Sequence, residues 1–228
     1  VEIKYRSSVR EIRVKNGKAE GLILSDDSFF PADVILANAD LPYVYQELLP
    51  ESRALRRINR LGYTCSALVF HWGTDCVLPG LEQHNVYVSN DYRQNLEEVF
   101  HGSGIAAEPS FYIHSPARAD RSAAPEGQDS ISVIVPVGHL GENREYDWEK
   151  VRNDARRSVL DRLAREGMLD FERHIRFEKV YNPVTWKNLF NLSRGATFGS
   201  LNHNLMQMGY FRPHNQHGKY GNLFFAGG

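Results

Sequence analysis

The sequence predicts a mixed α/β fold in which helices connect two separate groups of strands. Three observations support this fold class. Short β-rich runs with turn signals fill about the first forty residues, and a second group of such runs begins near Tyr63. Between Trp148 and Glu166, apolar residues recur at three- and four-residue steps, which is the period of an amphipathic helix. At 228 residues, the chain can form one large domain or two small ones.

The amino-terminal region is typical of a strand meander. Strands are expected at residues 2–5 and 9–14, and Asn16-Gly17 predicts a tight hairpin turn before the meander continues over residues 19–30. Residues 34–37 are apolar at every position, which predicts a strand that is buried on both faces of a sheet. A helix is expected next over residues 41–49.

The expected helices after residue 40 have a candidate N-cap and an arginine-rich face. Asp40 precedes the expected helix and is a candidate N-cap, because its side-chain oxygens can accept from free backbone N–H groups. A second helix is expected over residues 51–61, where the arginines share one face. A solvated surface accounts for that face, and contact with anionic lipid headgroups is the alternative. The arginines concerned are Arg53, Arg56, Arg57 and Arg60.

The second half of the fold is expected to hold an antiparallel sheet with helices. Its predicted strands are residues 63–72, 84–89, 110–115, 130–137 and 174–183, and its predicted helices are residues 91–102, 148–166 and 183–190. Residues 115–129 are rich in proline, alanine and charge and are expected to form a loop. A last strand at residues 223–226 ends in two glycines, which favours a close approach of the backbone to another group.

Composition argues against several functional classes. The net charge of −1, from 27 basic and 28 acidic residues, argues against nucleic acid as the main partner. The two cysteines, Cys65 and Cys76, do not have the spacing of a zinc site. His214 and His217, with His203 nearby, have no carboxylate partner in the sequence pattern, and no metal is expected there.

The sequence shows no catalytic acid, base or nucleophile of its own. Residues 102–107 match the pattern G-x-G-x-x-A, but an amphipathic helix precedes them where a dinucleotide site requires a strand. We therefore reject this segment as a cofactor site and leave the catalytic residues unassigned. A chain without such groups favours chemistry that a cofactor carries.

Three long segments resemble the phytoene desaturases of bacteria and fungi. These are residues 26–40 (DDSFFPADVILANAD), residues 110–140 with the runs AAPEG and PVGHL, and residues 190–228 with FNLSRGATFG and FRP. The two short runs are closest to the fungal branch. The resemblance implies an internal piece of an FAD-dependent enzyme that desaturates phytoene toward lycopene-type carotenoids. It also implies that residues 1–60 and 193–228 belong to a Rossmann-like FAD-binding domain. Residues 61–192 would then form an inserted substrate-binding domain of antiparallel sheet and helices.

The resemblance also implies a set of cofactor-binding positions. Val9 would place backbone groups near the adenine, although an ordinary core strand residue fits this position equally well. The strand end at Ala37, Asn38 and Ala39 would lie beside the cofactor. Gly227 and Gly228 would let the backbone approach the flavin. The 228-residue piece alone is expected to retain little FAD.

Further positions and partners follow from the same resemblance. The flavin and substrate cavity would be lined by Ala196, Phe198, Gly199, His203 and Phe211. The implied substrate is a hydrophobic polyene, which requires peripheral contact with a membrane surface, expected on the cytoplasmic side. A homo-oligomer is also expected. A carotenoid isomerase, an amine-oxidising flavoprotein and a lipid-binding module without cofactor are the alternatives.

Overall fold

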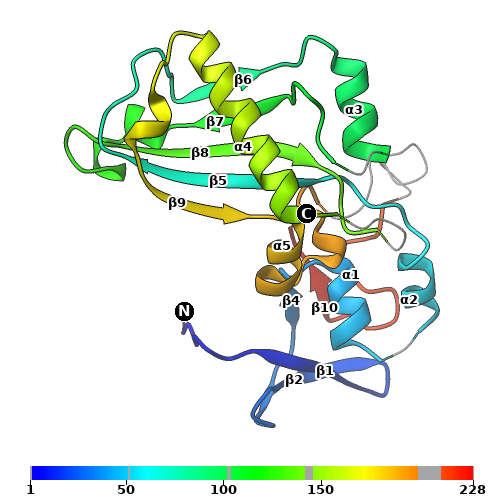
Figure 1. Ribbon diagram of the computed structural model, residues 1–228. Coiled ribbons are helices and arrows are strands. Elements are labelled where there is room, and N and C mark those ends of the chain that lie inside the picture. The colour runs from blue at the N-terminus through cyan, green and yellow to red at the C-terminus, as the bar shows by residue number, and fades with distance from the viewer. Residues whose placement is uncertain (1, 51, 102–103, 142–145, 200–211, 228) are drawn as a thin grey trace. The chain divides into compact units, whose positions relative to one another are not determined.

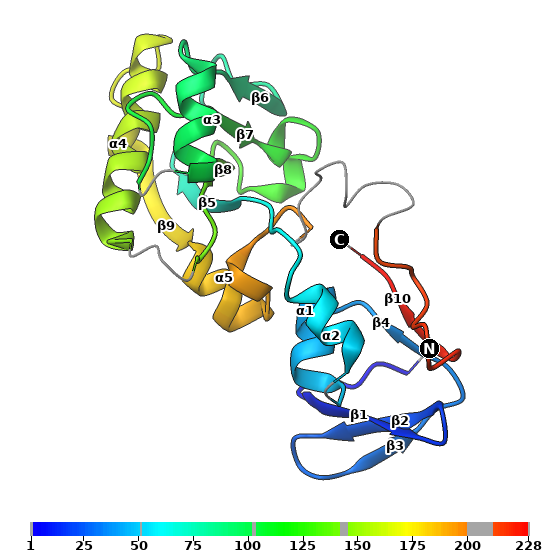
Figure 2. The same cartoon turned by 90° about the vertical axis from the view of Figure 1, so that its right-hand side faces the viewer.

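The computed structural model describes residues 2–50, 52–101, 104–141, 146–199 and 212–227 (Figure 1, Figure 2). Its contacts divide the chain into two compact units. The first unit holds Val1–Thr64, Phe190–Ser193 and Phe198–Gly228, and the second holds Cys65–Leu189 and Arg194–Thr197. Helices and mostly antiparallel sheets make up both units, so the predicted mixed α/β class is confirmed. The expected functional domains, residues 1–60 with 193–228 and residues 61–192, stay a prediction.

The first unit begins with a three-stranded antiparallel sheet in the order β1-β2-β3. Its strands are β1 (Val9–Lys15), β2 (Lys18–Leu24) and β3 (Phe29–Pro31). Asn16 and Gly17 both have positive φ angles, 50° and 77°, which fit the predicted hairpin turn. The strand predicted at residues 2–5 is wrong, because these residues lie outside every strand of the described chain. β-rich residues form a strand only where a neighbouring strand pairs with them.

A second, parallel sheet joins segments from near the two ends of the chain. β4 (Ile35–Ala37) pairs with β10 (Leu223–Phe225). The side chain of Asn222 connects this pair to β2: its Nδ2 donates to the carbonyl oxygens of Ala19 (2.7 Å) and Asp33 (2.9 Å). Its Oδ1 accepts from the backbone N–H of Ala19 at 3.0 Å. One amide thus satisfies backbone groups of β2 and of the segment that precedes β4.

The predicted burial of residues 34–37 on both faces is wrong within the described residues. Ile35 is 6% exposed, whereas Val34 and Leu36 are 63% and 64% exposed. The strand therefore follows the alternating pattern of a sheet with one covered face, because successive side chains of a strand point to opposite faces.

The helices of the first unit are short. α1 (Leu41–Tyr43) continues into a π-helical turn, η1 (Val44–Leu48), and α2 (Arg53–Ile58) follows. Asp40 occupies the predicted N-cap position, but its carboxylate accepts from the backbone N–H of Ser193 (2.9 Å) and makes no cap bond to the helix. Ser52 does cap α2, because its Oγ accepts from the N–H of Leu55. The four arginines predicted to share a face are all exposed.

The second unit is built on a five-stranded antiparallel sheet in the order β6-β7-β8-β5-β9, which confirms the expected antiparallel sheet (Figure 1). The strands are β5 (Ser66–Thr74), β6 (His84–Tyr87), β7 (Phe111–His114), β8 (Asp129–Val137) and β9 (Ile175–Tyr181). Alternate residues of β8 are buried along its whole length. One face of the sheet therefore forms the core of this unit.

The long helix α4 (Trp148–Arg165) packs on that face (Figure 2). The predicted apolar stripe is confirmed: Val151, Ala155, Val159 and Leu163 are all buried against the sheet. Asp147 caps the helix by accepting from the N–H groups of Glu149 and Lys150. The remaining elements are α3 (Tyr92–His101), α5 (Pro183–Phe190) and the 3-10 turns η2 (Pro116–Arg118), η3 (Arg121–Ala123), η4 (Phe171–His174) and η5 (Ser193–Gly195). Among the described helices, none combines the length and apolar character needed to cross a bilayer.

Candidate functional site

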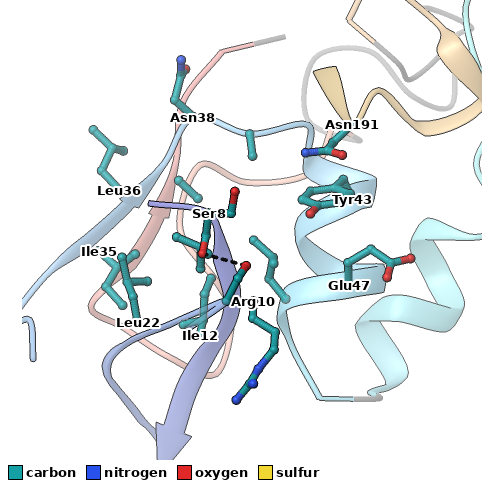
Figure 3. Close-up of a pocket in the computed structure, with 15 residues that line it drawn as sticks. Ser8, Arg10, Ile12, Leu22, Ile35, Leu36, Asn38, Tyr43, Glu47 and Asn191 are labelled. Carbon is teal, nitrogen blue, oxygen red and sulfur yellow. Dashed lines mark hydrogen bonds between the residues drawn. The ribbon is translucent and has the colours of Figure 1, made fainter. Parts of the chain in front are cut away.

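The first unit contains a pocket of about 730 Å³ beside the start of β1, the end of β4 and η1 (Figure 3). Four of the six residues predicted to bind a cofactor line it together. These are Val9, Ala37, Asn38 and Ala39. All the residues that line the pocket belong to the first unit.

The carboxyl end of β4 forms one wall of the pocket. Figure 3 shows Leu36 and Asn38 on this wall. The strand pairs with β10 up to Phe225 opposite Ala37, and the N–H of Ala226 donates to the carbonyl oxygen of Ala37 at 3.0 Å. A pocket at the carboxyl end of a parallel strand is the usual ligand-binding position in an α/β sheet.

Gly227, a fifth predicted residue, approaches the side chain of Asn38. Its φ is +88°, and a Cβ built on it would lie 2.9 Å from Oδ1 of Asn38. Only glycine adopts this backbone conformation without strain while leaving room for the amide. The sixth predicted residue, Gly228, lies outside the described residues.

The rest of the pocket combines apolar and polar side chains from distant segments. Figure 3 shows Tyr43, Glu47 and Asn191 across from the end of β4. The full lining is Ser8, Val9, Arg10, Ile12, Leu22, Ser25, Ile35, Leu36, Ala37, Asn38, Ala39, Tyr43, Glu47, Leu48 and Asn191. Hydroxyl, amide and carboxylate groups beside apolar side chains suit a partly apolar ligand that carries hydrogen-bond donors.

Several pocket residues were missed by sequence reasoning. Ser8 offers its carbonyl oxygen, which accepts from the backbone N–H of Ser25 at 2.9 Å. Arg10 forms an ion pair with Asp27, whose backbone has a positive φ of 68°. Glu47 lies in a π-helical turn, which the residue pattern did not predict. Asn191 reaches the pocket from a segment distant in the sequence, and its φ of 56° is positive.

The residues predicted to line a flavin and substrate cavity fall in different parts of the chain. Ala196 is 1% exposed and belongs to the second unit. Phe198, at 44% exposure, and Gly199, with a φ of +78°, belong to the first. His203 and Phe211 lie outside the described residues. The role of these five positions therefore stays a prediction.

His217 is held as a neutral acceptor in the core of the first unit. Its Nδ1 accepts from the backbone N–H groups of Lys219 and Tyr220, both at 3.1 Å. Its ring stacks on those of Tyr220 and Tyr45, with centroids 4.4 and 5.5 Å away. Burial, aided by the nearby Lys219 charge, lowers the pKa of His217 below its ordinary value. His214 is exposed and does not share this environment.

A cluster of potential metal ligands lies in the second unit, where β5 and β9 meet. Atoms of Asp75, Cys76 and His174 lie within 4.8 Å of one another. Asp75 is already paired, because its Oδ1 is 2.8 Å from Nδ1 of His174 and its Oδ2 pairs with Arg176. The His174 hydrogen bond, followed by that from Arg176, lowers the pKa of Asp75. These contacts describe an ion-pair cluster that connects two strands.

The sheet face opposite α4 carries two rows of side chains that cross all five strands. The strand registers place one residue of each strand in each row. One row is mainly apolar: Val86, Tyr112, Ile134, Val69 and Tyr181. The other is mainly polar: His84, His114, Ser132, His71 and Lys179. Sequence reasoning missed both rows, because they depend on strand registers that a single sequence does not contain.

Comparison with known proteins relates the whole chain to carotenoid desaturases. A phytoene desaturase of Fusarium fujikuroi is 37% identical over 247 residues, which cover 100% of this chain and 43% of that protein. A zeta-carotene-forming phytoene desaturase of Myxococcus xanthus is 37% identical over 100% of this chain and 44% of its own length. An all-trans-zeta-carotene desaturase of the same organism is 33% identical over 96% of this chain and 42% of its own length.

The chain thus spans less than half the length of these relatives. No family model matches it. Among solved structures, an oxidoreductase from Methanosarcina mazei aligns with a TM-score of 0.52 at 17% identity, covering 96% of this chain and 43% of that protein. This likeness bears on the fold alone. The resemblance to phytoene desaturases that the sequence motifs predicted is confirmed.

Proposed function

We propose that this chain, similar over its whole length to phytoene desaturases, is part of an FAD-dependent enzyme that desaturates a linear polyene. Phytoene is the proposed substrate, and the reaction leads toward lycopene-type carotenoids. The observation that carries the proposal is the 37% identity to named phytoene desaturases across the entire chain. Relatives named for different desaturation steps match the chain, so the number of double bonds introduced is not part of the proposal.

The pocket of the first unit fits one portion of FAD. We assign the adenine end to backbone groups around Val9 and the adjoining cofactor wall to Ala37, Asn38 and Ala39, which the structure brings together. Gly227 supports this assignment, because its positive φ and its contact with Asn38 leave no room for a side chain at the strand end. Glu47 and Asn191 offer a carboxylate and an amide for hydroxyl groups of a ribose.

The proposed chemistry needs little from protein side chains. Desaturation removes a hydride and a proton from neighbouring carbons, and the flavin supplies the hydride acceptor when it is bound. The chain's own residues would bind the cofactor, hold the polyene in place and exclude water. The sheet face with its apolar row supports the second of these roles, because it offers a continuous line of contacts across five strands.

A membrane surface is proposed as the source of the polyene. The exposed arginines of α2 and its flanks support peripheral contact, because Arg53, Arg56, Arg57 and Arg60 all face solvent and can attract anionic headgroups. Co-sedimentation with vesicles that contain an anionic lipid tests this contact, and vesicles of neutral lipid are the control. The cytoplasmic side and a homo-oligomer stay predictions, and light scattering of the purified protein tests the latter.

The proposed function is tested by expressing the complete reading frame in a bacterium that accumulates phytoene. We expect coloured polyenes, separated by chromatography and identified by their absorption bands. The empty vector is the first control, and a Gly227→Val variant of the same reading frame is the second, because its side chain would meet Asn38. Colourless cells whose purified protein contains flavin would favour an isomerase or another flavoenzyme. Colourless cells without flavin would favour the lipid-binding alternative.

A further inference from the structure

Three side chains at one end of the open sheet face of the second unit form an aromatic surface, which we name the ring platform. It consists of His84 on β6 and of Tyr112 and His114 on β7. The rings of His84 and His114 are 5.0 Å apart, with an interplanar angle of 12°. Tyr112 lies 6.0 Å from His84 at 21° and 6.5 Å from His114 at 10°. The three ring planes are therefore nearly parallel.

Some polar atoms of the two rows have hydrogen-bond partners on the same face of the sheet. Nδ1 of His84 lies 2.5 Å from the hydroxyl of Tyr112. Further along, Nδ1 of His71 lies 2.9 Å from Oγ of Ser132, and burial lowers the pKa of His71, which favours its neutral form. An apolar ligand placed beside these pairs therefore covers Nδ1 atoms that already have a protein partner, which limits the desolvation cost there.

The two ends of the face differ in the arrangement of their rings. Toward β9, the ring of His71 meets that of Tyr181 edge-on at 81°, and Tyr181 stacks on Trp186 of α5. At the β6 end, the platform lies beside Val86, which is 72% exposed. Because its three ring planes share one orientation, a rigid planar ligand meets each of them at nearly the same angle. A chain whose double bonds are isolated rotates about the single bonds between them and is not held flat.

We propose that the ring platform is a subsite for the conjugated part of the polyene, so that it distinguishes ligands by the length of their conjugated segment. This inference rests on the proposed function, which supplies the class of ligand. It adds the residues that would distinguish one polyene from another. Conjugated carbons are coplanar and carry a π-system, which interacts favourably with aromatic rings beyond simple burial of area. Phytoene has a short conjugated stretch and zeta-carotene a longer one, so the platform should favour zeta-carotene.

The test measures equilibrium binding of both polyenes to the purified product of the complete reading frame. Each polyene is dispersed in detergent micelles, and the amount retained by immobilised protein is quantified by chromatography. For Tyr112→Leu, which removes one ring, we expect zeta-carotene affinity to fall by about threefold to tenfold, and phytoene affinity to change by less than about twofold. Tyr112→Phe keeps the ring and should behave as the wild type.

Tyr92→Leu is the matched control, because Tyr92 is a 56% exposed tyrosine on α3, away from the two rows. It should leave both affinities unchanged. Equal losses for the two polyenes in Tyr112→Leu, or no loss at all, would overturn the proposal. If that variant does not fold, His114→Leu and His114→Tyr repeat the comparison between a lost and a kept ring.

The design separates this inference from the proposed function. If the wild type forms no coloured product in cells but its preference for zeta-carotene depends on Tyr112, only the desaturase assignment fails. If the wild type forms coloured product and Tyr112→Leu retains the full preference for zeta-carotene, only the platform fails.

Discussion

One ion pair from each compact unit illustrates how burial changes what charged side chains contribute. In the second unit, Arg118 and Asp129 form an ion pair whose side chains are 19% and 0% exposed. In the first unit, Arg10 and Asp27 form a pair whose side chains are 50% and 76% exposed, beside the pocket. A buried charge fixes the structure around it, whereas an exposed one contributes little to stability. The comparison teaches that losing one partner of the buried pair should destabilise the protein far more than losing one partner of the exposed pair.

The largest expected effect comes from breaking the buried pair. Besides Asp129, Arg118 binds the carbonyl oxygens of Leu81 (2.8 Å) and Leu78 (2.7 Å), so it holds a loop to the start of β8. Arg118→Ala would leave a fully buried carboxylate without its countercharge. We expect the free energy of unfolding to fall by about 3–5 kcal/mol, measured by urea denaturation of the purified protein.

Arg10→Ala is the matched control in the first unit. Because both partners are exposed, we expect a loss of about 1 kcal/mol or less. Equal losses in the two variants would show that the contrast between the two pairs does not hold.

The next effect concerns the cofactor wall of the first unit. In Gly227→Ala, the new Cβ would meet Oδ1 of Asn38 at 2.9 Å, and the residue would have to keep a φ of +88°. We expect FAD affinity of the complete protein to fall by about tenfold, because such strain costs on the order of 1 kcal/mol or more. Flavin fluorescence during titration measures the change.

Gly218→Ala is the control for that substitution. Gly218 lies in the same unit, and a Cβ there meets no atom within 4 Å. FAD affinity should stay at the wild-type level. Unchanged affinity in Gly227→Ala as well would remove Gly227 from the proposed cofactor site.

The smallest effect is a pH dependence that originates in His217. Burial holds its pKa in the folded state below the ordinary value of 6.5, so the unfolded chain binds a proton more readily than the folded one. Stability is then fully present above about pH 6.5 and decreases as the pH falls from there toward the lowered folded pKa. The urea midpoint, followed from about pH 7.5 down to about pH 5, should decline over this window.

His217→Gln, which keeps an acceptor but cannot titrate, should decline less steeply. Some decline remains in both proteins, because burial also lowers the pKa of His71 in the second unit. Identical slopes for wild type and variant would show that His217 does not contribute.

The sequence predicted the elements whose signals are local. The apolar stripe of α4 could be predicted because its 3.6-residue period lies within one continuous segment. The Asn16-Gly17 hairpin could be predicted because these two residue types adopt the positive φ angles of a tight turn. Residues 34–37 were misjudged because four apolar letters do not reveal which face of a strand is covered. The strand at residues 2–5 failed because pairing, not composition, makes a strand.

The candidate site likewise contains residues that the sequence could predict and residues that it could not. Ala37, Asn38 and Ala39 were predicted from a resemblance that extends over a strand end, and they do line one pocket with Val9. Glu47 and Asn191 were not predicted, because they reach that pocket from separate segments of the chain. The ring platform also escaped prediction, since the pairing of His84 with His114 is a property of strand register.

The pairing of β4 with β10 also determines the order in which the chain can assemble during synthesis. Ile35 emerges from the ribosome early, but its partner Leu223 and the amide of Asn222 emerge only after the whole second unit. The five-stranded sheet therefore has all its strands available while the first unit still lacks one. A premature stop between Thr197 and Asn222 would release a chain with a completed sheet in its second unit and an unpaired β4 strand, which is a substrate for chaperones and proteases.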